Sequence, residues 1–321
     1  MGTIKFQDII AARKVVARFL KSTPLIHYPE LSDRLGFQAY IKHENHNPTG
    51  SFKVRGGLNF MHHLPQVQRE KGVITATRGN HGQSIAYAAA QFGVKATVVV
   101  PHGNNPEKNS AMKAYGAELI EHGKDFDEAL TLCERLQAER GLYYVHPCME
   151  PPLFHGVGTY SLEIFESLPN VEAIIVPIGG GSGSCGAITV AKAINPKVKV
   201  IGVQAENAPA IYRSWKSGHP IETDSCDTIA DGLATRVPFA LPFSIIKDGI
   251  HDMVLLSEAE IVEGIRLALR WAHNLAEGAG AAPIAAAHKL TDTLAGKNVV
   301  MVMSGANLDT ETLKKTLAYQ L

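Results

Sequence analysis

The stretch Val176-Pro177-Ile178-Gly179-Gly180-Gly181-Ser182-Gly183-Ser184-Cys185-Gly186 runs from a β-branched segment through a glycine-rich loop into a helical pattern. Glycines allow neighbouring backbone N–H groups to converge, and the start of a helix adds partial positive charge there. The stretch therefore predicts a phosphate-binding loop at the carboxyl end of a strand. A flexible glycine-rich turn is the alternative that the stretch alone leaves open.

Other motifs fit this loop less well. No Lys-Ser or Lys-Thr pair follows at P-loop spacing, and the spacing of a hydrolase GxSxG elbow is absent. A GxGxxG pattern can be fitted from Gly181 to Gly186, with Glu206 as a loose candidate for the ribose-binding acid. A dinucleotide-dependent oxidoreductase therefore remains an alternative at this point.

A second motif is NPTGSFKVRGG, residues 47–57, in which Pro48 and Gly50 mark a turn. Ser51 is the candidate cap of the following helix, so Lys53 falls in the first helical turn. The helix dipole is unfavourable for a cation there, and enclosure lowers the pKa of an amine further. A neutral amine is what condensation with an aldehyde cofactor requires. A solvated lysine on an amphipathic helix is the alternative.

Two further strand ends carry polar residues. VVMVMSGAN, residues 299–307, is a buried-strand pattern ending at Ser304, whose hydroxyl can make a hydrogen bond at a site mouth. TATRGNHGQ, residues 75–83, leads from a strand into a helix whose N–H groups favour a carboxylate. The alternatives are a helix cap at Ser304 and a structural histidine at His81. Together, the four stretches describe a pyridoxal-phosphate (PLP) site better than any other cofactor site.

Apolar β-branched runs alternate with helical patterns along the chain. This alternation predicts an α/β fold with parallel-rich sheets flanked by helices, in which ligands bind at the carboxyl ends of strands. The expected strands are 39–42, 73–76, 96–100, 118–121, 143–145, 173–177, 198–203 and 299–303. The expected helices are 82–92, 107–115, 126–139, 154–167 and 258–275.

The composition narrows the function classes. The chain has 321 residues, 45% of them hydrophobic, which suffices for two lobes. Its 31 basic and 31 acidic residues give no electrostatic basis for binding nucleic acid or an anionic membrane. We find no apolar run of membrane-spanning length, no signal-peptide pattern and no CxxC spacing, so we expect a cytoplasmic protein with reduced thiols.

In its motifs and their order, the chain resembles the threonine/serine dehydratase and serine racemase family of PLP enzymes, which have the tryptophan synthase β-like fold (fold type II). The resemblance runs from Thr23-Pro24-Leu25 through TGSFKVRG, RGNHGQS, GGGSGSCG and TIADGL to SGANLD. It implies a large PLP-binding lobe of residues 1–71 with 150–321 and a small mobile lobe of residues 72–149. It also implies a homodimer.

The resemblance assigns expected roles to matching residues. Lys53 would be the catalytic residue, which carries PLP covalently and moves the substrate α-proton. Ser304 would contact the pyridine nitrogen. The expected cofactor contacts are Phe52, Lys53, Asn80, Gly179, Gly180, Gly181, Ser182, Gly183, Gly232, Glu277 and Ser304. The expected substrate contacts are Ser51, Thr77, Arg78, Gly79, Asn80 and His81, of which Thr77, Asn80 and His81 would receive the carboxylate.

A neutral hydroxyl at the pyridine nitrogen favours elimination. Ser304 does not enforce a protonated ring, so prompt loss of a β-hydroxyl would avoid a long-lived carbanion. We therefore expect dehydration and deamination of L-threonine or L-serine to a 2-oxo acid and ammonia. The alternatives are a phenylserine or 3-hydroxyaspartate dehydratase, a serine racemase, and a non-enzymatic amino-acid-binding sensor on the same fold.

Three departures from the family pattern bear on this expectation. Arg78 stands where the racemases carry a serine as second acid/base, which disfavours racemisation. We favour an Arg78 that faces solvent or pairs with a nearby acid over one that meets an acidic substrate. Gln204 and Ala210 stand where cation-binding members carry acids, so Glu206 is left alone and we expect no metal. Little sequence follows SGANLD, so we expect no isoleucine-binding regulatory domain.

Overall fold

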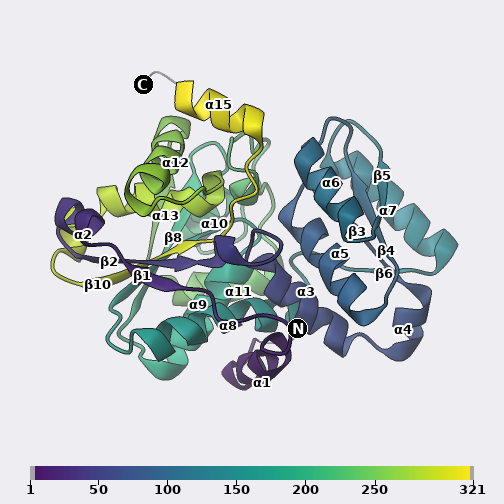
Figure 1. The fold of residues 1–321 in the computed structure, drawn as a ribbon, viewed down its shortest axis with the longest axis horizontal. Helices are drawn as coiled ribbons and strands as arrows, with labels where there is room; N and C mark the ends of the chain where they lie inside the picture. Colours follow the sequence, from purple (N-terminus) through teal and green to yellow (C-terminus); the bar gives the residue numbers. More distant parts are fainter. Residues whose placement is uncertain (1–3, 319–321) are drawn as a thin grey trace.

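The computed structural model describes residues 4–318, which form two sheets side by side. One sheet has six strands in the order β1-β2-β10-β7-β8-β9, and the other has four in the order β5-β4-β3-β6. Figure 1 shows the two sheets with α3 (Lys53–His63) at their junction. Helix α3 packs against α5 (Asn80–Phe92) on one side and α8 (Pro151–Ser167) on the other. It therefore joins the six-stranded sheet with its helices, which we call the six-stranded unit, to the four-stranded sheet with its helices, which we call the four-stranded unit.

The six-stranded sheet is parallel except at one edge, where β1 runs antiparallel to β2. Its strands are β1 (Leu25–His27), β2 (Gln38–His43), β7 (Ala173–Pro177), β8 (Lys199–Ala205), β9 (Asp252–Leu256) and β10 (Asn298–Met303).

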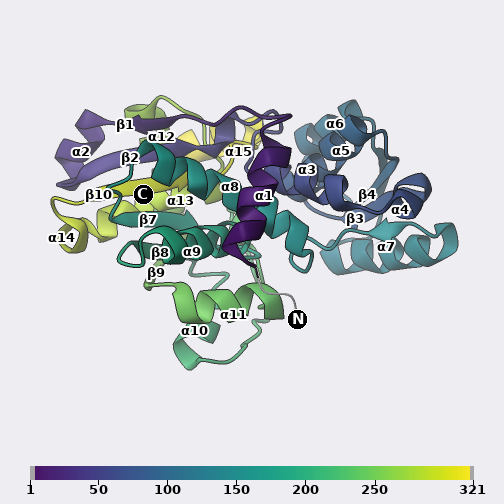
Figure 2. The ribbon, with the colours of Figure 1, turned by 90° about the horizontal axis from the view of Figure 1, so that it is seen from below.

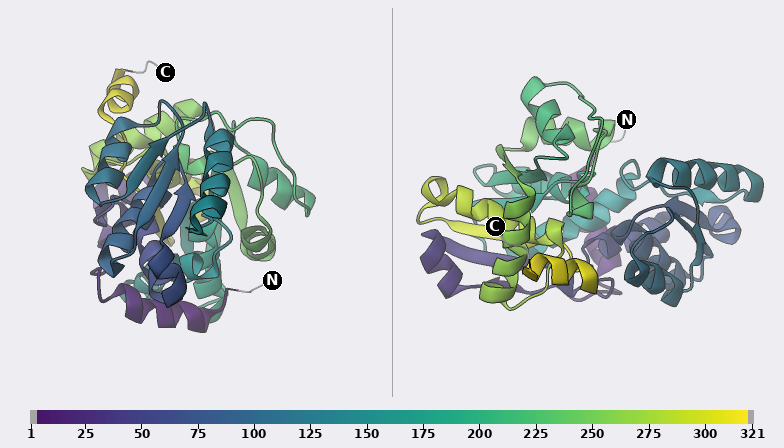
Figure 3. Two further views of the ribbon diagram at one scale, coloured as in Figure 1. Left: turned by 90° about the vertical axis from the view of Figure 1, so that its right-hand side faces the viewer. Right: turned by 90° about the horizontal axis from the view of Figure 1, so that it is seen from above.

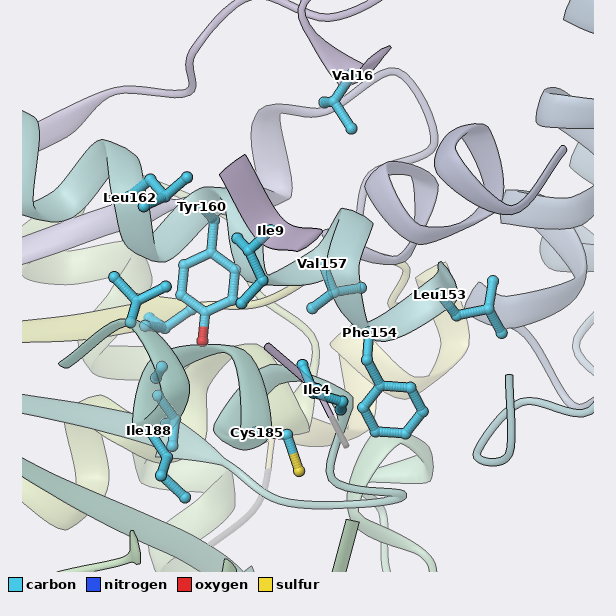
Figure 4. Packing of buried hydrophobic residues seen from close by; sticks show 14 of the residues in the cluster. Ile4, Ile9, Val16, Leu153, Phe154, Val157, Tyr160, Leu162, Cys185 and Ile188 are labelled. Carbon is cyan, nitrogen blue, oxygen red and sulfur yellow. The ribbon is translucent and has the colours of Figure 1, made fainter. Parts of the chain in front are cut away.

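Helices cover both faces of this sheet, because its central strands are apolar on both sides. Ile174 and Val176 belong to one buried cluster, and Ala173 and Ile175 belong to another. The first cluster includes residues of α1 (Phe6–Val16), α3, α8, α9 (Ser182–Ile194) and α11 (Ala240–Gly249). The second includes residues of α2 (Pro29–Leu35), α12 (Glu258–Ala272) and α13 (Gly278–Lys289). Figure 2 shows α1, α8 and α9 together, and Figure 4 shows Ile9, Val157 and Tyr160 in the first cluster.

The four-stranded sheet consists of β3 (Val73–Ala76), β4 (Ala96–Val100), β5 (Glu118–Glu121) and β6 (Tyr143–Tyr144), all parallel. Ile74 and Val99 pack against α7, while Val98 and Val100 pack with Met112 of α6. Figure 3 shows this sheet and its flanking helices facing the viewer in the left panel. The helices of this unit are α4 (Gln66–Lys71), α5 (Asn80–Phe92), α6 (Pro106–Ala114) and α7 (Phe126–Arg140).

The expected α/β architecture is confirmed, with differences in detail. The structure adds β1 and β9, which sequence analysis missed. The expected helix cap is wrong: Phe52 occupies the cap position of α3, although the Oγ of Ser51 accepts the Lys53 N–H at 3.2 Å.

No helix within residues 4–318 combines the length and apolarity needed to cross a membrane. The remaining helices are α1 (Phe6–Val16), α2 (Pro29–Leu35), α8 (Pro151–Ser167), α9 (Ser182–Ile194), α10 (Ala210–Ser217), α11 (Ala240–Gly249), α12 (Glu258–Ala272), α13 (Gly278–Lys289), α14 (Thr291–Leu294), α15 (Thr310–Ala318) and the 3-10 turns Glu44–His46 and Asp231–Leu233.

A buried ion network holds α3 in place. The guanidinium of Arg55, with no exposed surface, donates to Glu44 at 2.7 and 2.9 Å and to Glu163 at 2.8 Å through two nitrogens. Lys42 adds a 2.6 Å contact to Glu163. Burial opposes the Arg55 charge, but Glu44 and Glu163 raise its pKa overall. The network ties the helix that begins at Lys53 to β2, the turn after it and α8.

His43, the buried last residue of β2, is expected to make the stability of the fold sensitive to acid. Burial, with a smaller contribution from stacked His46, lowers its pKa from 6.5 to about 4. Unfolded histidine therefore binds more protons, so this contribution to stability is complete above about pH 6.5 and is lost toward pH 4. We expect His43→Gln to reduce the pH dependence of the unfolding free energy in this window by up to ~1.4 kcal/mol per pH unit.

Urea unfolding at pH 7 and pH 5 measures this difference. His122→Gln, at an exposed position, serves as the control. Equal pH dependence in the His43 variant and the wild type would contradict the assignment.

Candidate active site

Lys53, the first residue of α3, lies beside the glycine loop. Its Nζ is 3.1 Å from the Oγ of Ser182, although the residues are 129 positions apart. Its backbone carbonyl accepts a 2.6 Å hydrogen bond from the Oγ of Ser84 in α5. Burial lowers the pKa of the amine, and Cys148 opposes this shift. The arrangement therefore favours a neutral, nucleophilic amine next to a polar loop.

The loop between β7 and α9 requires its glycines. Gly181 has φ = 89°, which glycine adopts without strain. A Cβ on Gly179 would overlap the carbonyl oxygen of Gly232, and one on Gly180 would overlap the Sγ of Cys148. The chain thus turns tightly into the N-terminus of α9 (residues 182–194), where the first backbone N–H groups are available for an anion.

The end of β10 lies against the lysine segment. The carbonyl of Ser304 accepts the N–H of Phe52 at 3.0 Å, and Ser51 forms a β-bridge with Gly305. Ser304 is buried, with 3% of its surface exposed. The Phe52 ring centre lies 5.2 Å from the Lys53 Nζ. Three segments that are distant in sequence therefore meet at one site: the start of α3 at Lys53, the start of α9 at Ser182 and the end of β10 at Ser304.

The loop from Thr77 to His81 leads from β3 into α5. The Oγ1 of Thr77 accepts the N–H groups of Gly79 at 3.0 Å and Gly82 at 3.3 Å. His81 is buried, with its Nε2 3.2 Å from the carbonyl of Val145. Burial and the charge of Lys53 lower the His81 pKa to about 3. A neutral His81 with Nε2 protonated satisfies this contact.

Asn80 connects this loop to the six-stranded unit. Its Nδ2 donates to the Oε1 of Glu277 at 2.5 Å, and its Oδ1 accepts from Asn307 at 2.7 Å. Burial raises the Glu277 pKa, while Lys108 and then Asn80 oppose the rise. The orientation of the Asn80 side chain is therefore determined by two partners on the other unit.

Arg78 differs from its neighbours because it is exposed. No hydrogen bond or ion pair joins it to another residue of the described chain. Burial raises the pKa of the nearby Cys226 thiol, and Arg236 and then Arg78 oppose the rise. The structure thus leaves Arg78 facing solvent, whereas its neighbours Thr77, Gly79 and His81 are buried.

Four residues around the site were missed by sequence reasoning. Cys148 lies against the glycine loop, and burial raises its pKa to about 11 against the opposing effect of Lys53. Asn307 holds Asn80, and Lys108 and Asp231 pair beside Glu277. Asn307 could have been selected from the SGAN stretch, but Lys108 gives no signal because it resembles any polar residue on a helix.

These residues fit a phosphorylated aldehyde. The Cβ-free loop at the start of α9 suits a phosphate, and the enclosed amine of Lys53 suits a carbonyl carbon. The buried hydroxyl of Ser304 offers a neutral hydrogen-bonding group at a strand end. The fold and the site together define an α/β enzyme of the kind that binds a phosphorylated cofactor on a lysine.

Residues 16–305 match the family described as pyridoxal-phosphate dependent enzyme, and the chain belongs to this family. It is 39% identical over 314 residues to an L-threonine ammonia-lyase of Thermotoga maritima. The aligned region covers 98% of this chain and 78% of that protein. The cofactor of this enzyme is therefore PLP.

Solved structures give the same result. The processed form of threonine deaminase isoform 2 from Solanum lycopersicum superposes with a TM-score of 0.92 and 33% identity, covering 99% of this chain and 95% of that one. Maize serine racemase superposes with a TM-score of 0.93 and 28% identity, covering 99% and 98%. The fold is the tryptophan synthase β-like fold of PLP enzymes, as the resemblance implied.

Proposed function

We propose that this PLP-dependent ammonia-lyase converts L-threonine, and L-serine as a smaller analogue, into a 2-oxo acid and ammonia. The observation that carries the proposal is the Lys53 amine, its pKa lowered by burial, 3.1 Å from Ser182 at the start of α9. The similarity to L-threonine ammonia-lyases over 92–98% of the chain supports the choice of substrate.

The bound cofactor supplies the electron sink that allows an amino acid to lose its α-proton. Lys53 holds and returns that proton, because its amine is enclosed and nucleophilic. Gly179–Gly181 with Ser182 and Gly183 would hold the phosphate, Gly232 and Phe52 would lie beside the ring, and Ser304 would offer its neutral hydroxyl to the ring nitrogen. A neutral partner would leave the ring a weak electron sink, which would favour loss of the β-hydroxyl.

The substrate carboxylate binds at the loop from Thr77 to His81. The N-terminus of α5 favours a negative group, and Asn80 provides a side-chain donor held by its own partners. Neutral His81 adds no charge there. Ser51 and Gly79 complete the expected substrate contacts.

We propose that residues 72–149, which make up the four-stranded unit without α4, form a mobile lobe that closes over the substrate. The rest of the described chain forms the large lobe, and the site lies between them. Closure excludes water from the reacting atoms. We also propose that the enzyme acts in the cytoplasm and forms a homodimer. Light scattering of the purified protein at several concentrations tests the homodimer.

A substrate panel tests the proposed reaction. We expect 2-oxobutanoate from L-threonine and pyruvate from L-serine, each with equimolar ammonia, at rates well above those for phenylserine and 3-hydroxyaspartate. Accumulation of D-serine without pyruvate would identify a racemase instead. Amino-acid binding without any keto acid would identify a sensor, and preferred turnover of 3-hydroxyaspartate that Arg78→Ala abolishes would assign Arg78 to an acidic substrate.

A further inference from the structure

Lys108 is a buried lysine through which the four-stranded unit reaches the active site. It stands in the first turn of α6, and 6% of its side chain is exposed. Its Nζ lies 3.0 Å from the Oδ2 of Asp231 and 4.0 Å from the Oε2 of Glu277, both on the six-stranded unit. A lysine in the first turn of a helix opposes the helix dipole and is seldom buried unless paired. The two carboxylates offset these costs only while the units are together.

The Lys108 contacts continue into the site. Glu277 is shared, because its Oε2 faces Lys108 while its Oε1 accepts from Asn80 at 2.5 Å. The methylene chain of Lys108 packs on the loop from Thr77 to His81, since a Cβ on Gly79 would lie 2.9 Å from the Cδ of Lys108. The side chain thus touches the residue before Asn80 and the carboxylate that orients Asn80.

Other polar contacts dock the same helical turn. The Nδ2 of Asn105 donates to Asp309 at 2.9 Å, and Glu107 accepts from the N–H and hydroxyl of Thr310 at 3.1 and 3.0 Å. The Glu107–Thr310 contacts are exposed, so solvent screens them more strongly. Lys108 is a buried charge at this junction, and solvent screens a buried charge less than an exposed one.

We propose that Lys108 is a positioning residue that couples closure of the two units to substrate binding. Its ammonium holds Asp231 and Glu277 across the junction, and Glu277 in turn fixes the amide of Asn80. Loss of the ammonium lowers the fraction of molecules that are closed before substrate binds. The apparent affinity for substrate falls in proportion to the closed fraction. At saturating substrate the enzyme is still closed, so its maximal rate changes little. The identity of that substrate rests on the proposed function.

Lys108→Gln and Asp231→Asn, each expressed as the PLP-loaded full chain, test the proposal. We expect the KM for L-threonine to rise about tenfold in either variant, with kcat changed less than about threefold. The double variant should be no worse than the more affected single variant, because both remove one interaction. Lys113→Gln is the matched control, since Lys113 is exposed on the same helix. The visible absorbance of the lysine-bound cofactor should be unchanged in all of them.

Hydrogen–deuterium exchange decides the proposal independently of turnover. Peptides covering residues 105–114 and 223–236 should exchange faster in Lys108→Gln and Asp231→Asn than in Lys113→Gln and the wild type. If the wild type turns over no β-hydroxy amino acid, the proposed function fails while this exchange difference still supports the Lys108 proposal. Wild-type exchange in both variants, or a loss of thermal stability with unchanged KM, would overturn it.

Discussion

Replacing Lys53 with alanine is expected to lower the rate of 2-oxobutanoate release by roughly 10³-fold or more, because the amine has no substitute as nucleophile and proton carrier. The glycine loop and its helix N-terminus remain, so the protein should still bind PLP without a covalent bond. We expect the purified variant to lose the visible absorbance of the lysine-bound cofactor. Borohydride treatment followed by peptide mass spectrometry should add the cofactor mass to the Lys53 peptide of the wild type.

The control for this experiment is Lys113→Ala, at an exposed position on α6. It should keep both the absorbance and the turnover of the wild type. Cofactor mass on a peptide without Lys53, or substantial turnover by the Lys53 variant, would refute the assignment of the catalytic lysine.

Replacing Arg55 with methionine is expected to reduce the free energy of unfolding by about 3–5 kcal/mol. The substitution leaves Glu44 and Glu163 buried without the guanidinium that makes four hydrogen bonds to them. Lys42 and Arg13 still reach Glu163, but neither hydrogen-bonds to Glu44. Urea unfolding of the variant at pH 7 measures the loss.

Arg140→Met provides the comparison, because the Arg140–Glu118 pair is 43% and 51% exposed. Exposed pairs contribute about 0–1 kcal/mol, so this variant should unfold close to the wild type. An equally small effect for Arg55→Met would show that the buried network is not needed to hold α3.

The fold could be predicted in large part from local patterns. The ranges 73–76, 96–100, 118–121 and 173–177 are strands with the expected bounds. Their β-branched residues lie between turn or helix signals, so sequence neighbours alone identify them. β1 was missed because it has three residues and an exposed side, and it is stabilised by pairing with β2. β9 likewise depends on its partner β8 at the sheet edge.

The site could be predicted only where a motif carries its own chemistry. The glycine loop and the lysine motif could be predicted in this way, since close backbone approach and the start of a helix are local properties. Lys108 and Asp231 do not, because nothing near either residue distinguishes it from a solvated charge. Their pairing depends on the contact between α6 and the six-stranded unit, which no short stretch of sequence encodes.

Local patterns in the chain are enough to specify an alternating α/β architecture, a loop that suits a phosphate and a lysine at the start of a helix. Tertiary structure alone brought Lys53 to 3.1 Å from Ser182, buried Arg55 between two glutamates and placed Lys108 next to Glu277. The physical reason is that backbone preferences act between neighbouring residues, whereas burial, and the pKa shifts that follow from it, depend on residues brought together from distant parts of the chain.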